Sequence, residues 1–159
     1  MSTLYIMCGP SGSGKSTYAA QLAKNNLQIV IVSTDTIRKE FFGNEEDQTQ
    51  GDKVFKIAYN RIWRHLFLER DVVFDATNLT RRDRQKLKNF IEYKKKTEKS
   101  ELEIKYVCIV MNTSLKTCIA NQANRARKVP IEVIEKQYKR FQFPYVNDGW
   151  NEIRIIEEI

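Results

Sequence analysis

A glycine-rich run at residues 9–17 separates an apolar stretch from a stretch with the pattern of a helix. The run reads Gly-Pro-Ser-Gly-Ser-Gly-Lys-Ser-Thr and directly follows Leu-Tyr-Ile-Met-Cys at residues 4–8. Its glycines allow the backbone to curl until successive N–H groups face one anion. The following helix would add its own unpaired N–H groups and the positive end of its dipole. This order of strand, loop and helix predicts a phosphate-binding loop for a nucleotide, in preference to an ordinary glycine-rich turn.

Two side chains of this loop carry most of the expected chemistry. Lys15 would reach the β- and γ-phosphate oxygens, and Ser16 would ligate Mg²⁺. The predicted cofactors are therefore ATP, or another nucleoside triphosphate, and Mg²⁺. The other loop residues expected to contact the nucleotide are Gly9, Pro10, Ser11, Gly12, Ser13, Gly14 and Thr17.

The length and composition of the chain are those of a soluble globular protein. Its 159 residues are most simply one domain, residues 1–159, with 42% hydrophobic and 30% charged residues. No apolar stretch reaches the ~20 residues that span a bilayer, and the first strand begins too early to leave room for a signal peptide. The three cysteines include no Cys-x-x-Cys pair. We therefore expect a cytoplasmic thiol protein with no membrane contact.

The net charge of +7 favours an anionic partner. The excess is concentrated in residues 81–99, where nine Lys and Arg residues occur with three acidic residues. This segment is either a solvated helix face or a track for a phosphate backbone. Nucleic acid is one polyanion that such a surface would attract.

Apolar runs alternate with helical patterns along the chain, which predicts a parallel sheet with helices on its faces. The apolar runs lack clean period-two alternation, as expected for strands that are covered on both sides. Thr80 is expected to cap a helix with Asp83 in its first turn, and Pro130 to lie in the first turn of the last helix. The predicted strands are residues 4–8, 28–33, 72–75, 102–110 and 152–156, and the predicted helices are residues 15–24, 36–42, 53–68, 81–96, 114–124 and 131–141.

Ligands of such sheets bind beyond the carboxyl ends of the strands. The second strand is followed by Asp35, a candidate general base for an attacking hydroxyl, or alternatively a helix N-cap. Arg38 comes one helical turn later and could clamp an anionic acceptor. The third strand ends in Asp75, a candidate Mg²⁺ ligand or a structural residue that binds nearby amides. Thr77 and Asn78 would either bind the substrate or brace the phosphate loop.

Phosphoryl transfer also needs positive charge on the side opposite the phosphate loop. Arg125 and Arg127 lie in an irregular, arginine-rich stretch at residues 124–129, and they would supply this charge from a lid that closes on ATP. Surface ion pairing is the alternative role for these arginines. His65 is expected to be a partly packed residue of a helix, because the chain has no second histidine for a metal pair or a relay.

These motifs occur in a fixed order and end in a distinctive tail. They read Gly-Pro-Ser-Gly-Ser-Gly-Lys-Ser-Thr at 9–17, Ser-Thr-Asp-Thr-Ile-Arg at 33–38, Asp-Ala-Thr-Asn at 75–78, Asn-Arg and Val-Pro within 124–130, and Phe, Pro and Asp-Gly-Trp within 141–150. The ordered set resembles the P-loop polynucleotide 5′-hydroxyl kinase family. The resemblance covers essentially the whole chain, and the set is far more specific than the phosphate loop alone.

The resemblance implies a three-layer P-loop NTPase fold with a mainly parallel five-stranded sheet and an arginine-bearing lid. It implies a stand-alone kinase that moves the γ-phosphate of ATP to the 5′-hydroxyl of DNA or RNA, with nucleic-acid repair as its setting. In this family the residue matched by Asp35 activates the hydroxyl, and the residue matched by Arg38 binds the acceptor's phosphate. A lid arginine, matched by Arg125, contacts the donor. The chain departs from the family at Asn121-Gln122, where members often carry Arg-Asn.

Two other functions stay open at this stage. Related P-loop kinases act on small molecules such as a nucleoside, a sugar or an antibiotic, and they share the acidic residue after the second strand. An open basic groove beyond Arg38 would favour a polymer, and a closed polar pocket would favour a small molecule. The chain could also be an ATP-binding module that transfers nothing, although such a module would not need the Asp35 and Arg38 pair.

Overall fold

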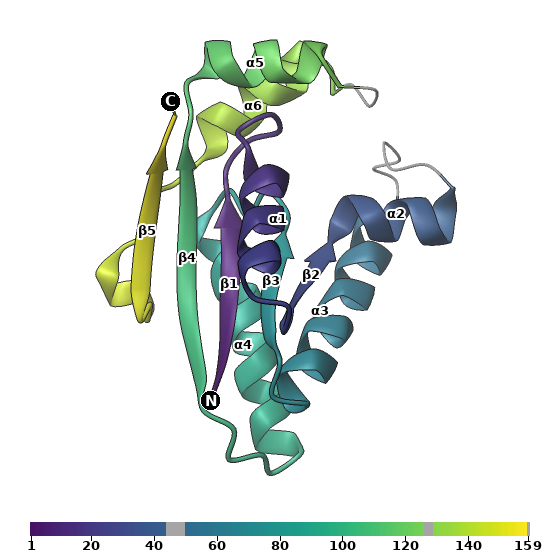
Figure 1. Ribbon diagram of the computed structural model, residues 1–159, viewed down its shortest axis with the longest axis vertical. Helices are drawn as coiled ribbons and strands as arrows, with labels where there is room; N and C mark the ends of the chain where they lie inside the picture. The colour runs from purple at the N-terminus through teal and green to yellow at the C-terminus, as the bar shows by residue number, and fades with distance from the viewer. Residues whose placement is uncertain (44–49, 126–128, 159) are drawn as a thin grey trace.

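The carboxyl ends of five parallel strands meet at one end of the molecule, near helices from the second half of the chain (Figure 1). The computed structural model describes residues 1–43, 50–125 and 129–158. The strands are β1 Ser2–Cys8, β2 Ile29–Ser33, β3 Asp71–Asp75, β4 Ile104–Asn112 and β5 Glu152–Glu157. Their order in the sheet is β2-β3-β1-β4-β5, and every pair of neighbours is parallel. The predicted α/β fold with a parallel five-stranded sheet is confirmed.

Helices cover both faces of this sheet, because the side chains of its central strand alternate between two cores. Leu4 and Ile6 of β1 pack in a core with residues of α3 and α4, whereas Met7 packs on the other side with Ala19 of α1. None of the helices in the described ranges is long and apolar enough to cross a membrane. The helices are α1 Lys15–Asn25, α2 Thr34–Phe42, α3 Gly51–Phe67, α4 Arg81–Thr97, α5 Leu115–Ala123 and α6 Ile131–Arg140, with a 3-10 turn at Val146–Asp148.

Helices α2, α3 and α5 begin at other residues than the sequence predicts, whereas α1, α4 and α6 begin as predicted. Helix α2 begins two residues early because Ser33 is its cap, and the Ser33 hydroxyl accepts a hydrogen bond from the Thr36 N–H. The alternative interpretation of Asp35 as the cap is therefore wrong, since Asp35 lies inside the first turn. Pro130 is the residue before α6 and does not lie within its first turn.

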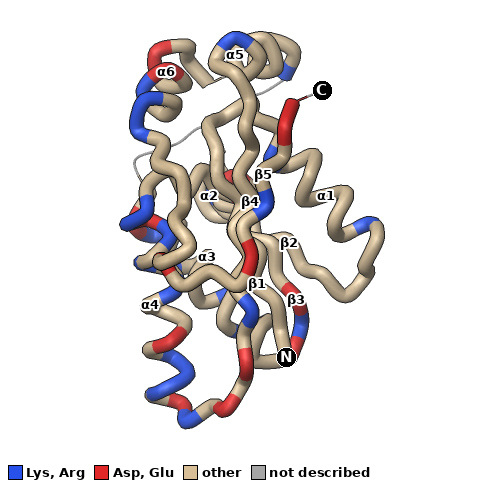
Figure 2. Tube along the Cα trace, turned by 90° about the vertical axis from the view of Figure 1, so that its left-hand side faces the viewer, with Lys and Arg blue, Asp and Glu red and all other residues tan. Residues whose placement is uncertain are grey.

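Three of the basic residues in the 81–99 segment hold the tail of the chain against α4. The Arg81 guanidinium pairs with the Asp148 carboxylate at 2.6 Å, and the Lys88 ammonium donates to the Asp148 carbonyl. Arg84 is almost completely buried and donates to the Gln142 carbonyl. Figure 2 shows that the other charges along α4 are of both signs. The charge excess of this segment is thus partly a structural clamp on residues 141–150.

Candidate active site

The glycine-rich loop joins β1 to α1, and its backbone has the curled form that an anion cradle needs. Gly12 and Gly14 have φ angles of 84° and 98°, which are in the left-handed region that favours glycine. A Cβ on Gly12 would lie 2.2 Å from the carbonyl oxygen of Cys118 in α5. Glycine is therefore required at this position both by the backbone conformation and by the approach of α5.

Lys15 and Ser16 occupy the first turn of α1. Lys15 is buried, and its ammonium donates to the Pro10 carbonyl at 2.8 Å, so the side chain folds over the loop. Burial lowers the pKa of Lys15, while the nearby Asp75 and Asp35 carboxylates act in the opposite direction. The Ser16 hydroxyl donates to the Asp75 carboxylate at 2.8 Å. This hydroxyl and carboxylate offer hard oxygen ligands of the kind that Mg²⁺ prefers.

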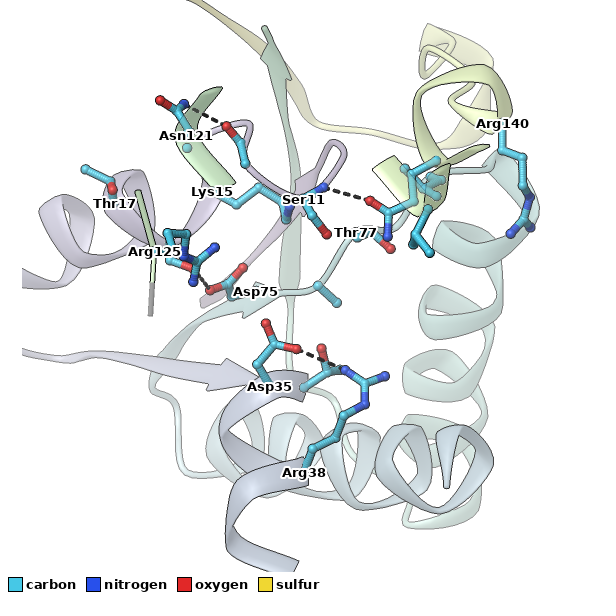
Figure 3. Close-up of a pocket in the computed structure, with 18 of the residues that line it drawn as sticks. Ser11, Lys15, Thr17, Asp35, Arg38, Asp75, Thr77, Asn121, Arg125 and Arg140 are labelled. Atoms are coloured by element: carbon cyan, nitrogen blue, oxygen red, sulfur yellow. Dashed lines mark hydrogen bonds and ion pairs between the residues drawn. The ribbon is translucent and has the colours of Figure 1, made fainter. Parts of the chain in front are cut away.

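The phosphate loop opens into a cleft of about 750 Å³. Asp35 and Arg38 of α2 line the same cleft as Lys15, and Figure 3 shows the Asp35 and Arg38 side chains next to each other, joined by a dashed line. The structure therefore brings together the predicted cradle, the predicted base and the predicted acceptor clamp. Among the described residues, the charged ones that line the cleft are Lys15, Arg38, Arg125, Lys136, Arg140, Asp35 and Asp75.

The predicted base and clamp contact each other directly. Arg38 Nη1 lies 3.1 Å from Asp35 Oδ1, one helical turn away on α2. The Asp35 side chain is 34% exposed, whereas the Arg38 side chain is 8% exposed. Arg38 Nε is buried without a hydrogen-bond partner among the described residues. A buried guanidinium donor of this kind is suited to an anionic ligand entering the cleft.

Thr77 and Asn78, after β3, have different surroundings. Thr77 lines the cleft, and its carbonyl accepts a hydrogen bond from the Gly9 N–H at 2.9 Å. Asn78 is buried and is not part of the cleft wall. Its side-chain amide donates to the Met7 carbonyl at 2.8 Å, so its contacts are those of the bracing role and not those of a substrate ligand.

Of the two predicted lid arginines, the structure describes Arg125 but not Arg127. Arg125 follows α5 and lines the cleft near Asp75, as Figure 3 shows. Arg127 lies outside the described residues, as does Lys128. His65 is half-buried on α3, and its Nδ1 lies 3.1 Å from Arg70 Nη1. Burial, followed by the neighbouring arginines, lowers the pKa of His65.

Sequence reasoning missed two amide side chains that fasten helices to the phosphate loop. Asn121 of α5 donates to the Gly12 carbonyl at 2.8 Å. Gln137 of α6 accepts a hydrogen bond from the Ser11 N–H, also at 2.8 Å. The spacing of Val133, Lys136, Gln137 and Arg140 places these residues on one face of α6, and this face lines the cleft. That spacing could have indicated that these four residues share a face of α6, but not that the face meets the phosphate loop, and Asn121 has no comparable signal.

Most of this chain matches a single protein-family model. A family model described as an AAA domain matches residues 4–144. The chain belongs to this AAA domain family. The match begins before the phosphate loop and ends after α6, so it includes every described residue that lines the cleft.

Two curated proteins are similar to most of this chain, but the similar region is only part of each of those proteins. One is the L-seryl-tRNA(Sec) kinase of Methanococcus maripaludis, 26% identical over 93% of this chain and 56% of that protein. The other is a protein of Autographa californica nuclear polyhedrosis virus named as a bifunctional polynucleotide kinase/RNA ligase, 25% identical over 87% of this chain and 20% of that protein. The chain thus spans about half of the first relative and a fifth of the second.

One solved structure has a similar fold over nearly all of this chain. Chaetomium thermophilum Kti12, crystallised in complex with ADP-AlF3, has a TM-score of 0.72 and 15% sequence identity over 97% of this chain and 88% of that chain. At this identity the likeness concerns the fold alone. The family match and the named relatives together support a P-loop kinase, and the relatives differ in the acceptor that their names give.

Proposed function

We propose that this protein is an ATP-dependent kinase that transfers the γ-phosphate to the 5′-hydroxyl of a polynucleotide. The observation that supports the proposal most directly is the position of Asp35 and Arg38 in the same cleft as Lys15. A module that only binds ATP would need no carboxylate and guanidinium pair facing its phosphate loop. The viral relative named as a polynucleotide kinase/RNA ligase adds support for the acceptor class.

In this proposal the phosphate loop holds the donor. The loop N–H groups and the Lys15 ammonium bind the β- and γ-phosphates, and Ser16 and Asp75 would hold Mg²⁺. When bound, Mg²⁺ would neutralise charge on the phosphate oxygens. Arg125 lines the cleft and adds positive charge toward the transferring group.

The acceptor hydroxyl binds near Asp35 and Arg38, where the phosphoryl group is transferred to it. The oxygen of the 5′-hydroxyl attacks the γ-phosphorus, and the bond between this phosphorus and the β–γ bridging oxygen breaks to release ADP. Asp35 accepts the hydroxyl proton, while the buried Arg38 binds the phosphate of the terminal nucleotide. The products are ADP and a 5′-phosphorylated strand.

Transfer of labelled phosphate from ATP to 5′-hydroxyl DNA and RNA oligonucleotides tests this proposal. We expect label on the oligonucleotide, and none on an otherwise identical oligonucleotide that already carries a 5′-phosphate. Failure to label any oligonucleotide by a protein that still binds ATP would remove the polynucleotide acceptor. A nucleoside, a sugar and an antibiotic in the same assay test the small-molecule alternative.

A further inference from the structure

One face of α6 lines the cleft beside the phosphate loop. Val133, Lys136, Gln137 and Arg140 follow one another at helical spacing on this face. Ile134, on another face of the helix, is completely buried and fixes the helix against the protein. Helix α6 therefore presents a defined surface to any acceptor that extends beyond Asp35.

Gln137 sets the position of this surface relative to the donor. Its side-chain oxygen accepts a hydrogen bond from the Ser11 N–H at 2.8 Å, across 126 positions in the sequence. The neighbouring helix α5 is fastened to the same loop by the bond from Asn121 to the Gly12 carbonyl. Because both helices are bonded to the phosphate loop, the cations on α6 have a defined position relative to that loop.

Lys136 and Arg140 are cations of the cleft wall that no described acidic side chain pairs with. Within the described part of the chain, neither side chain makes a hydrogen bond or an ion pair, although Glu132 and Glu135 lie on the same helix. Some other arginines of the described residues are paired, such as Arg61 with Glu40 at 2.7 Å. What distinguishes Lys136 and Arg140 is that they line the cleft, where they are available to a ligand.

The carboxylates of the cleft do not supply the missing counter-charge. Asp75 is bonded to Ser16, and Asp35 is paired with Arg38. Among the described residues, five cationic side chains line the cleft against these two carboxylates, so this part of the cleft wall carries excess positive charge. Lys15 and Arg125 lie on the donor side, which leaves Lys136 and Arg140 for the acceptor.

We propose that Lys136 and Arg140 form a second phosphate subsite, which binds internucleotide phosphates of the acceptor strand. This inference rests on the proposed polynucleotide kinase function and extends it beyond the terminal nucleotide at Arg38. The two side chains are four residues apart, or about 6 Å along the helix axis, so each can serve a different phosphate. Gln137 is a positioning residue for both, because it ties α6 to the phosphate loop.

Salt dependence of oligonucleotide binding counts these contacts directly. Each phosphate contact with a single strand contributes about 0.7 to the slope of log affinity against log salt concentration. We expect the slope for a 5′-hydroxyl single-stranded oligonucleotide to become shallower by about 0.7 in Lys136→Ala and in Arg140→Ala, and by about 1.4 in the double variant. Lys139→Ala is the matched control, since Lys139 is an exposed residue of α6 that does not line the cleft.

Comparing a long acceptor with a short one distinguishes the contribution of the α6 subsite from that of the Arg38 site. A nucleoside 3′-monophosphate offers one phosphate, which Arg38 binds, and does not extend to α6. The double variant is expected to raise the KM for the oligonucleotide and to leave the KM for the nucleoside 3′-monophosphate unchanged. Gln137→Leu is expected to raise the KM for the oligonucleotide by a larger factor than the KM for the nucleoside 3′-monophosphate, because it releases α6 from the Ser11 N–H. A loss of folding would change both constants and lower the melting temperature.

The outcomes distinguish the two proposals. If the wild type phosphorylates no 5′-hydroxyl oligonucleotide, the proposed function is wrong and the subsite is wrong with it. If the wild type is active and the double variant has an unchanged salt slope and an unchanged oligonucleotide KM, only the α6 subsite is wrong. A change of equal size in Lys139→Ala would also overturn it, because general surface charge would then explain the effect.

Discussion

The Ser16 hydroxyl lies 2.8 Å from the Asp75 carboxylate, so the start of α1 is bonded to the end of β3. These two residues are 59 positions apart in the sequence, yet they are neighbours because β1 and β3 pair in the centre of the sheet. The two oxygen ligands expected for Mg²⁺ are therefore already together in the protein. In the described part of the chain, no group of three or more His, Cys, Asp or Glu side chains could hold a metal, so the remaining ligands would come from the nucleotide and water.

The first prediction concerns this pair. Asp75→Asn is expected to raise the Mg²⁺ concentration needed for half-maximal phosphate transfer by roughly 10- to 100-fold, because a carboxylate that holds or orients the metal is lost. A titration of activity with Mg²⁺ at saturating ATP measures the shift. Asp52→Asn is the matched control, since Asp52 is exposed at the start of α3 and does not line the cleft. An unchanged Mg²⁺ requirement would exclude Asp75 from the metal site.

The second prediction concerns the base. Asp35→Asn removes the proton acceptor and keeps the size of the side chain, so kcat is expected to fall by about 10²- to 10⁴-fold. ATP affinity is expected to stay largely unchanged, because the phosphate loop binds the donor. Single-turnover transfer and calorimetric ATP binding measure the two quantities. A variant that transfers phosphate at the rate of the wild type would show that Asp35 is not the base.

The motifs predicted from the sequence are those whose chemistry is local. The phosphate loop, the residues after the strands and the helix cap at Thr80 with Asp83 in the first turn each depend on a few adjacent residues, and the structure has all three. Parallel strands also end at one edge of the sheet, which is why Asp35 and Asp75 could be expected to lie together. The start of α2 was missed because Ser33 and Asp35 are both good caps, and only the backbone geometry distinguishes them.

The contacts that were not predicted join segments far apart in the chain. Gln137 and Asn121 act through amide groups that carry no charge, and nothing in their neighbourhood marks them as ligands of the phosphate loop. Arg84 was counted as part of a basic surface, but it is buried and bonded to the Asn78 and Gln142 carbonyls. A charged residue can be assigned to the interior only when its partners are known, and these partners come from the tertiary fold.

The third prediction tests the loop geometry. Gly12→Ala is expected to lower the free energy of unfolding by about 2 kcal/mol or more, because alanine is strained at a φ of 84° and its Cβ would meet the Cys118 carbonyl. The melting temperature would then fall by about 4 °C or more. Gly51→Ala is the matched control, since it lies at the start of α3 with no atom within 4 Å of its added Cβ. Equal losses in the two variants would contradict the argument from close approach.

The fourth prediction is an acid-dependent loss of stability at the clamp between α4 and the tail. The hydrogen bond from Arg81 lowers the pKa of Asp148 from 3.8 to about 2. A carboxylate with a lowered pKa stabilises the folded protein above its ordinary pKa, and this stabilisation is lost as the pH falls from about 4 toward 2. Because the Arg81 side chain is 44% exposed, we expect Asp148→Asn to cost only about 1 kcal/mol at pH 6.

Urea unfolding of the wild type and Asp148→Asn at several pH values between 6 and 2.5 measures this effect. The difference in the free energy of unfolding between the two proteins is expected to shrink steadily below pH 4, because protonated Asp148 no longer binds Arg81 as an anion. Glu101→Gln serves as the control, since Glu101 is exposed and outside the clamp. A difference that stays constant over this pH range would mean that Asp148 stabilises the tail through its contacts with the Tyr145 N–H, and not through its charge.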